Sequence, residues 1–258
     1  KLEVRYPNFE GLNLTWELLE GLVKHNGPVI GPDTPVAALP AAFRDFPQLA
    51  DLELDQFAGP EAQVAALSDD IAYNNHDIDD GIAAGLFTID ELMDLPIVGD
   101  EFRSVRIEYP HLNDRMVSYE AVRRLIGLWI NDLTDETQRR VKTHNPGSAA
   151  AVRAMDVPLV AFSAELESRQ RALRAFLYER MYKHFKVNRM RSKAKRMLAE
   201  LFEIFLAEPG TLPPPWRMDA EQAPELKRAR IVCDYIAGMT DNYAMDEYRR
   251  LYDPQALR

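Results

Sequence analysis

The segment SDDIAYNNHDIDDG at residues 68–81 gathers side chains that can bind cations, transfer protons or hold a polar ligand. It combines several aspartates with a histidine, adjacent asparagines and a tyrosine. Aspartate and asparagine are mediocre helix formers because their short side chains compete for nearby backbone groups, yet the surrounding apolar residues recur at helical spacing. The composition is compatible with a solvated acidic face, a cation site or part of an active site.

A helix is predicted to start at Pro60, since proline suits the first turn of a helix, and to continue to Gly85. On this helix Asp69, Tyr73 and Asp77 are spaced i, i+4 and i+8, so they line one face. An acidic arc and a core stripe are expected on opposite sides. The acidic arc contains Asp69, Tyr73, His76, Asp77 and Asp80, and the core stripe contains Val64, Leu67, Ile71, Ile78 and Ile82.

The residue pattern alone leaves two interpretations of the acidic arc equally weighted. A solvated face is the usual role of a run of charges, but no lysine or arginine lies between these acids and Tyr73 stands among them. A divalent cation or a polar ligand would explain the stacked carboxylates. A magnesium motif like that of prenyl-diphosphate enzymes is a weak alternative, because Asp69-Asp70 is followed next by Asp77 and no Asp-Asp-x-x-Asp spacing occurs.

The rest of the chain also has helical periodicity, with only 12 glycines and with prolines between the periodic segments. A capping box is predicted at Thr88 and Glu91, and a break in the loop at residues 208–216. The helices are expected at 15–25, 98–108, 112–143 and 148–155, as two helices over 163–207 with a joint near Val187-Asn188, and as two terminal helices that meet at Gly238. The predicted fold class is all-α.

Composition excludes several classes of protein. The chain has 258 residues, a net charge of -10 and one cysteine, Cys233, so no intramolecular disulfide can form and a reducing, cytoplasmic location is expected. No apolar run approaches the roughly 20 residues of a membrane-spanning helix, and no membrane partner is expected. The acidic balance disfavours a protein that simply coats nucleic acid.

Three segments carry a resemblance to a known family. They are EAQVAALSDDIAYNNHDIDDG, GLNLTWELLEGLVKHNGP at 11–28 and DYIAGMTDNYAMDEYRRLY at 234–252. In this order they resemble the bacterial deoxynucleoside triphosphate triphosphohydrolases, dGTPase-like members of the HD-domain phosphohydrolases. The resemblance implies an irregular multi-helix HD-type domain that lacks its N-terminal helices. Residues 1–97 would be the remainder of the HD core and 98–258 a C-terminal helical extension, together in one compact unit.

The resemblance also implies a chemistry and roles for particular residues. Such enzymes split a dNTP into a deoxynucleoside and tripolyphosphate with a divalent metal, for which Mg²⁺ or Mn²⁺ is expected and another transition metal is an alternative. Asp69 matches a metal ligand. Tyr73 would pack against the deoxyribose and Asp77 would accept a hydrogen bond from the 3′-hydroxyl. Lys24 matches a lysine that contacts the triphosphate, although a lysine before Asn26-Gly27 is also typical of a helix C-terminus.

The family's remaining active-site residues are expected upstream of the RYP segment, where this sequence begins. They are a first histidine, a His-Asp metal pair, and a catalytic histidine and glutamate. His76-Asp77 is not that pair, because it follows Asp69 on the same predicted helix. We therefore expect no catalytic residue of the family in this sequence, and no dNTPase activity from the chain alone.

A basic segment, YERMYKHFKVNRMRSKAKR at 178–196, stands out in an otherwise acidic chain. It is either a solvated helical face or a contact for phosphate groups. Tyr182 and Phe185 within it have the spacing of core residues. Because related enzymes are commonly oligomers and some respond to nucleotides or single-stranded DNA, a regulatory dNTP or DNA site is a hypothesis for Lys183, Lys186, Arg189 and Arg191. The alternative function is a non-catalytic all-α module that binds nucleotides or nucleic acid through this segment.

Overall fold

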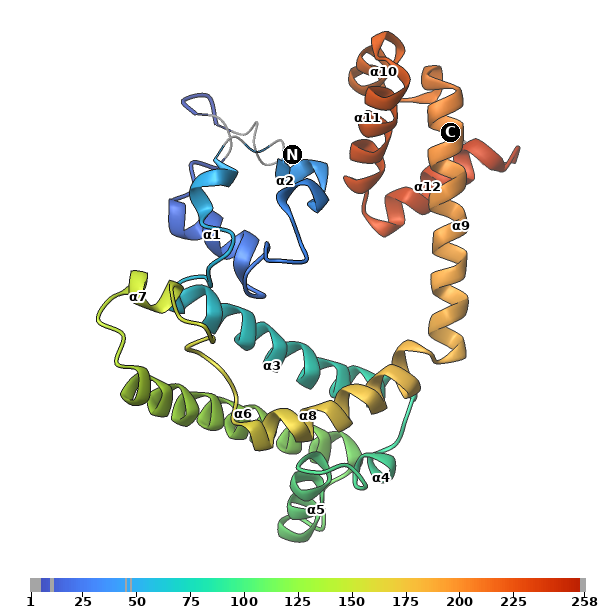
Figure 1. Cartoon of the computed structure of the whole chain (residues 1–258). Helices are drawn as coiled ribbons and strands as arrows, with labels where there is room; N and C mark the ends of the chain where they lie inside the picture. Colours follow the sequence, from blue (N-terminus) through green and yellow to red (C-terminus); the bar gives the residue numbers. More distant parts are fainter. Residues whose placement is uncertain (1–5, 10–11, 45, 47, 256–258) are drawn as a thin grey trace. The chain divides into compact units, whose positions relative to one another are not determined.

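A computed structural model describes residues 6–9, 12–44, 46 and 48–255 of the chain (Figure 1). These residues form an all-α fold, as predicted, and the described part contains no β-strand beyond one isolated antiparallel bridge between Gly31 and Thr34. Contacts divide the chain into two compact units, Lys1–Met181 and Tyr182–Arg258. The boundary expected between residues 97 and 98 separates the HD core from its C-terminal helical extension. It is a boundary between segments of the resembled family and not between groups of contacts, so it stays a prediction.

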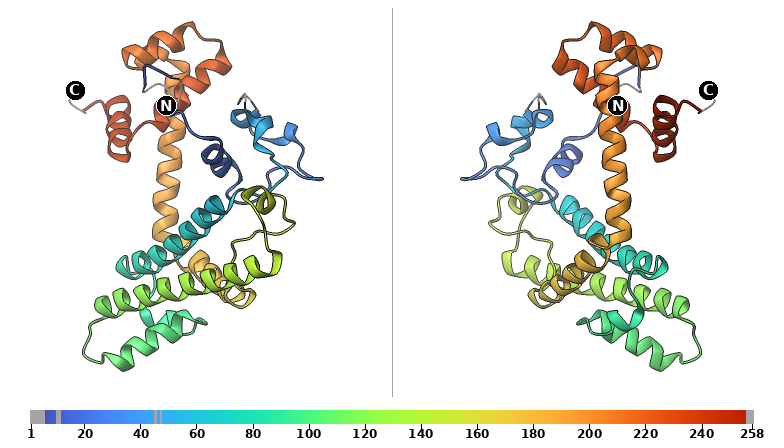
Figure 2. Two further views of the ribbon diagram at one scale, coloured as in Figure 1. Left: turned by 90° about the vertical axis from the view of Figure 1, so that its left-hand side faces the viewer. Right: turned by 90° about the vertical axis from the view of Figure 1, so that its right-hand side faces the viewer.

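The first unit is built around two long helices that run side by side, α3 (Pro60–Ala83) and α6 (Asp114–His144) (Figures 1 and 2). Helix α1 (Trp16–Lys24) and helix α8 (Ala164–Leu177) also pack against α3, and α5 (Val98–Glu108) packs against α6. The shorter helices of this unit are α2 (Ala41–Arg44), α4 (Ile89–Leu92) and α7 (Ala149–Arg153).

Several helix starts follow from local sequence, because a side-chain oxygen at the N-cap position accepts a hydrogen bond from a free backbone N–H. Thr15 does so for α1, and Ser163 does so for α8. The predicted capping box is confirmed, since Thr88 and Glu91 bond each other's backbone N–H groups at the start of α4. Pro60 occupies the first turn of α3, also as predicted.

The core stripe predicted for α3 is correct at its centre and wrong at one end. Ile71 and Ile78 are buried, whereas Val64 is 45% exposed. Polar residues of the same helix are buried in turn, among them Asn74, Asn75 and Asp77. Because α1, α6 and α8 all pack against α3, its buried positions extend around the helix and do not follow a single hydrophobic stripe.

Gly81, which ends the acidic segment, lets an aromatic ring pack directly on the backbone of α3. A Cβ atom at this position would lie 2.1 Å from the ring of Phe87. Phe87 is buried, and its ring lies edge-on to that of Phe176 at 5.1 Å between centroids. Because position 81 has no side chain, the Phe87 ring of the following turn can pack against the end of α3.

The second unit has a core of its own, formed by residues from α9 (Phe185–Ala207), α10 (Pro214–Gln222), α11 (Glu225–Ala237) and α12 (Asp241–Tyr252). Its buried residues are Leu201, Phe205, Leu212, Ala220, Val232, Tyr235 and Ala244. Helix α10 begins inside the predicted 208–216 loop, because a proline at its first position fits a helix start. The two terminal helices meet at Gly238, as predicted.

The joint predicted near Val187-Asn188 was placed too late in the chain. Helix α8 ends at Leu177, a π-helical turn spans Tyr178–Tyr182, and α9 begins at Phe185. The break falls there because the His184 ring accepts a hydrogen bond from the backbone N–H of Lys186 and so caps α9. Among the described residues, no helix has the length and apolar character needed to cross a membrane.

Candidate functional site

The three residues predicted to form one wall of an active site lie on successive turns of the unbroken helix α3. Their side chains differ in how far they are exposed to solvent. Asp69 is exposed and Tyr73 is 56% exposed, whereas Asp77 is only 8% exposed. The helix therefore places the accessible carboxylate of Asp69, the phenol of Tyr73 and the enclosed carboxylate of Asp77 along one side. A hydrogen bond to an enclosed carboxylate is weakened less by water than a hydrogen bond at the surface.

Two asparagines of α3 are buried as well. Asn74 and Asn75 are 6% and 1% exposed. The Asn75 side-chain amide donates to the backbone carbonyl of Ile71 at 2.7 Å, a bond within α3 itself. The asparagines that made this segment unusual as a helix are thus packed inside the unit.

The described residues do not supply a full set of ligands for the metal ion predicted at Asp69. No group of three or more histidine, cysteine, aspartate or glutamate side chains in that part of the chain is arranged to hold one. Asp69 offers a single hard carboxylate, which suits Mg²⁺ or Mn²⁺ but does not make a site by itself.

Lys24, predicted to contact a triphosphate or to cap a helix end, is buried in an ionic network. Its side chain is 0% exposed, and Nζ lies 2.9 Å from Glu20 Oε1. Nζ also donates to the backbone carbonyl of Glu53 at 3.0 Å. In this structure the ammonium group is therefore held by two acceptors of the unit itself, and Lys24 is also the last residue of α1, in agreement with the alternative of a lysine at a helix C-terminus.

Arg153 completes the network from the far end of the unit's sequence. Its Nε and Nη2 atoms donate to the two carboxylate oxygens of Glu20 at 2.8 and 2.9 Å, and its guanidinium lies 4.7 Å from the ring centre of Trp16. Burial raises the pKa of Glu20, but the hydrogen bonds from Arg153 and Lys24 outweigh it and hold that pKa below its usual value. Sequence reasoning missed this network, although the i, i+4 spacing of Glu20 and Lys24 was a signal.

A cavity of about 480 Å³ opens next to Lys24, between α1, α3, α6, α8 and the loop at 157–162. Asp70, the second acid of the SDD sequence, lines it. Across the cavity Arg174 Nη2 lies 3.5 Å from Asp70 Oδ2 and 3.2 Å from Gln170 Oε1. The acidic segment therefore contributes to this cavity as well as to the Asp69 face.

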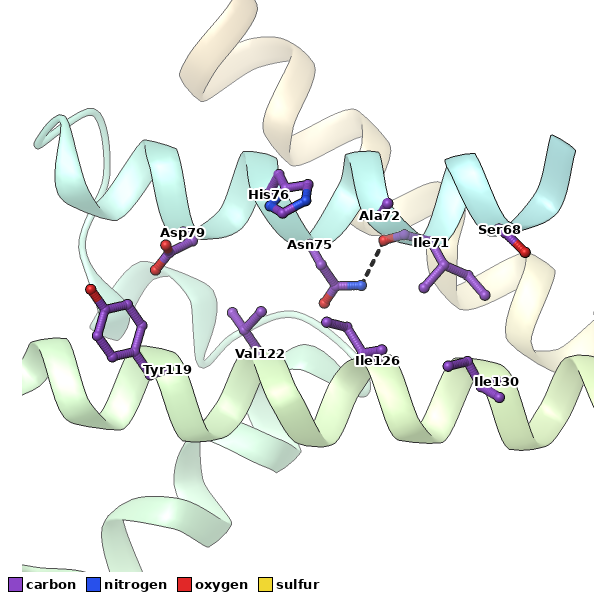
Figure 3. Close-up of a pocket in the computed structure, with 10 residues that line it drawn as sticks. All are labelled: Ser68, Ile71, Ala72, Asn75, His76, Asp79, Tyr119, Val122, Ile126 and Ile130. Carbon is purple, nitrogen blue, oxygen red and sulfur yellow. Dashed lines mark hydrogen bonds between the residues drawn. The ribbon is translucent and has the colours of Figure 1, made fainter. Parts of the chain in front are cut away.

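A smaller groove of about 390 Å³ lies between α3 and α6 (Figure 3). Asn75, His76 and Asp79 line it from α3, and Tyr119 lines it from α6 together with aliphatic side chains. Asp79 accepts a hydrogen bond from Ser118 Oγ at 3.1 Å. His76, expected in the acidic arc, thus belongs to the surface of this groove.

The basic segment is exposed along the start of α9. Lys183, Lys186, Arg189 and Arg191 are all exposed in the structure. Phe185 is 60% exposed and its ring stands against that of His184 at 4.8 Å, so the prediction that Phe185 is a core residue was wrong. The first half of α9 is an exposed cationic surface, because the core of the second unit begins further along the helix at Leu201.

The terminal motif GMTDNYA joins α11 to α12 in the second unit. Thr240 caps α12 by accepting from the backbone N–H of Tyr243. The Tyr243 and Tyr235 hydroxyls lie 3.2 Å apart, and burial together with this hydrogen bond raises the pKa of Tyr235. Thr240 is therefore the N-cap of α12, and these hydrogen bonds are made within the second unit.

Comparison with known proteins shows which proteins this chain is similar to. A phosphohydrolase-associated domain matches residues 160–250. A deoxyguanosinetriphosphate triphosphohydrolase-like protein of Parvibaculum lavamentivorans is 56% identical over 98% of this chain and 64% of its own length. Proteins of the same description from Caulobacter vibrioides and Mesorhizobium japonicum are 51% and 46% identical, again over 98% of this chain and over 64% and 63% of their own lengths.

Over 98% of its length the chain is similar to deoxyguanosinetriphosphate triphosphohydrolase-like proteins. This similarity confirms the resemblance carried by the SDDIAY, LVKHNGP and GMTDNYA segments. The chain spans slightly less than two thirds of the length of these relatives, 64% for Parvibaculum lavamentivorans. The match at 160–250 includes the whole of the basic segment and the buried core residues of the second unit.

Proposed function

We propose that this chain is part of a metal-dependent dNTP triphosphohydrolase that splits a dNTP into a deoxynucleoside and tripolyphosphate. The observation that carries the proposal is the face of α3, where Asp69, Tyr73 and Asp77 follow one another on a single helix in a chain similar to deoxyguanosinetriphosphate triphosphohydrolase-like proteins. The names of the relatives support a phosphohydrolase reaction on a deoxynucleotide.

The proposal gives each of these side chains a separate task. Asp69 is a ligand of Mg²⁺ or Mn²⁺, with its other ligands supplied by sequence present in the longer relatives, since the described residues hold no such group. Tyr73 borders the deoxyribose, and the enclosed Asp77 carboxylate accepts a hydrogen bond from the 3′-hydroxyl. A triphosphate contact by Lys24 stays a prediction, and it requires Nζ to leave Glu20 or Glu53.

The proposal is tested with a chimeric protein. The 253 matched residues of the Parvibaculum lavamentivorans relative are replaced by this chain, and each dNTP is offered with Mg²⁺ or Mn²⁺. We expect release of tripolyphosphate by the chimera, loss of that release on Asp69→Asn, and no turnover by the 258-residue chain alone. Release of pyrophosphate, or turnover by the chain alone, would contradict the proposal.

The exposed basic segment favours a second role, binding of a regulatory dNTP or single-stranded DNA by the assembled enzyme, which we propose to be a homo-oligomer. Four exposed cations and the exposed Phe185 ring offer phosphate contacts and a stacking surface. The same surface would serve a non-catalytic binding module if the chimera proved inactive.

Single-stranded DNA binding by this surface is measured by fluorescence anisotropy at several salt concentrations. The double variant Lys186→Glu/Arg189→Glu is expected to weaken binding and to reduce the salt dependence by about 0.7 per lost phosphate contact. Lys227→Glu, an exposed residue of α11, is the matched control. Equal affinity of the double variant, the control and the unmodified chain would rule this surface out.

A further inference from the structure

The buried carboxylate of Glu20 is shared by two cations, although one cation would neutralise it. Arg153 donates to both of its oxygens, from Nε at 2.8 Å and from Nη2 at 2.9 Å. Lys24 Nζ lies 2.9 Å from one of the same oxygens, Oε1. Glu53 and Glu17 also attract Arg153, but both are exposed and water screens their charge. The buried part of the network therefore holds two positive charges against one negative charge.

The two cations are not held equally firmly. Arg153 has a planar guanidinium that binds the carboxylate in a bidentate way, and its centre lies 4.7 Å from the ring centre of Trp16. Lys24 has a compact ammonium on a flexible stem, and Nζ lies 6.0 Å from the centre of the same ring. Besides one oxygen of Glu20, its other acceptor is the backbone carbonyl of Glu53 at 3.0 Å. Of the two cations, Lys24 is therefore the one that can exchange its partner more easily.

Arg153 changes what it costs to separate Lys24 from Glu20. A buried carboxylate that loses its counter-ion is strongly destabilised, because its charge is left uncompensated. If Nζ leaves Glu20, the carboxylate still accepts both hydrogen bonds from Arg153 and one from the backbone N–H of Gly59 at 3.4 Å. Lys24 also lines the cavity beside α1, so its ammonium has space on that side.

We propose that Arg153 is a positioning residue, which keeps Glu20 neutralised while the Lys24 ammonium moves from Glu20 to an anionic group in the cavity. Arg153 lies outside the cavity lining and acts through Glu20. The anionic group is the triphosphate if Lys24 has the contact predicted for it, so the inference rests on the proposed function. Without Arg153, Lys24 would be needed as the counter-ion of Glu20 and would be held there.

A double-mutant cycle tests whether Arg153 acts through Lys24. Tripolyphosphate is titrated calorimetrically into the 258-residue chain and into Arg153→Gln, Lys24→Gln and the double variant. Each single variant is expected to weaken binding by about tenfold, and the double variant by no more than either of them. If Arg153 attracted the anion directly, its loss would weaken binding in the Lys24→Gln background as well. Arg153→Lys, which retains a counter-ion for Glu20, is expected to restore most of the affinity.

Arg123 offers a matched control at the surface of the same unit. It also binds a carboxylate in a bidentate way, that of Glu120, and Arg124 is the second cation on that carboxylate. The Arg123 side chain is 71% exposed. Arg123→Gln removes the same charge as Arg153→Gln and is expected to bind tripolyphosphate like the unmodified chain.

NMR of the unmodified chain provides a measurement that needs no variant to fold. On addition of tripolyphosphate, the signal of Lys24 Nζ is expected to shift, whereas the signal of Arg153 Nε is expected to stay in place. Absence of binding, additive effects in the cycle, or a shift of Arg153 Nε as large as that of Lys24 would each overturn the proposal. Hydrolysis of dNTPs by the chimera is a separate measurement, so the failure of one proposal can be distinguished from the failure of the other.

Discussion

At the scale of residues, the ionic network around Glu20 shows how the surroundings set the behaviour of a side chain. Glu20 and Lys24 are both 1% exposed, and Arg153 joins them from a position 133 residues further along the chain. A buried charge is stable when it is paired and hydrogen-bonded, and removing one partner leaves the others uncompensated. The network is therefore expected to hold α1 on the first unit.

Replacement of Glu20 by glutamine is expected to destabilise the first unit by about 3–5 kcal/mol, the usual effect of breaking a buried ion pair. Urea denaturation followed by circular dichroism at pH 7 measures the change. Asp94→Asn, in the loop after α4 and outside the network, is the control. A loss no larger than that of the control would show that the network contributes little to stability.

The lowered pKa of Glu20 also predicts a pH dependence. Since the pKa in the folded protein is lower than the unfolded value of 4.5, the stabilisation is fully present above that value and is lost as the pH falls through the folded pKa. The stability of the unmodified chain should therefore fall more steeply below pH 4.5 than that of Glu20→Gln. Parallel stability curves for the two proteins over this range would contradict the assignment.

At the scale of elements, α3 shows how one helix serves both packing and a site. Its N-terminal half lines the cavity near Lys24, its middle carries Asp69 and Tyr73, and its last turns are fixed by the contact of Gly81 with Phe87. The position of the acidic segment therefore depends on how tightly both ends of α3 are held.

Gly81→Ala is expected to destabilise the first unit by about 1–3 kcal/mol, because an added Cβ would overlap the Phe87 ring and force it to move. Gly127→Ala on α6 is a matched control, since no atom lies within 4 Å of a Cβ there. That substitution should stabilise the helix by up to about 1 kcal/mol. Thermal unfolding of both variants checks the prediction, and effects of equal sign would contradict it.

At the scale of the whole molecule, the chain consists of two units that each have their own buried core. The wall with Asp69 and the cavity with Gln170 belong to the first unit, and the basic segment begins at its end and continues on α9. The residues proposed to bind the metal and the substrate therefore belong to the first unit. The residues proposed for the regulatory surface, from Lys183 to Arg191, belong to the second unit.

The second unit is expected to fold by itself. Expressed as residues 182–258, it should be helical by circular dichroism and unfold cooperatively in urea. Phe205→Ala, which removes a ring with 0% exposure from its core, should destabilise it by about 3–5 kcal/mol. A fragment without helical signal, or without a cooperative transition, would show that this core is insufficient alone.

The sequence determined the local features of this protein, because helical geometry and capping depend on residues a few positions apart. The all-α class, the starts at Thr15, Pro60 and Thr88, and the alignment of Asp69 with its neighbours on α3 could all be predicted. Their order with LVKHNGP and GMTDNYA also carried the resemblance to the dGTPase-like proteins, which the comparison with known proteins confirms.

Tertiary structure alone decided which of these residues are enclosed and what surrounds them. Asp77 is buried while Tyr73 is exposed, Lys24 is held by Glu20, and Gln170 retains an unused donor next to Asp70. Each outcome depends on segments that are distant in sequence, such as α8 and α7 packed near α3 and α1. Helical periodicity specifies the direction of a side chain, but only the packing of other elements determines whether it meets water, a partner or a cavity.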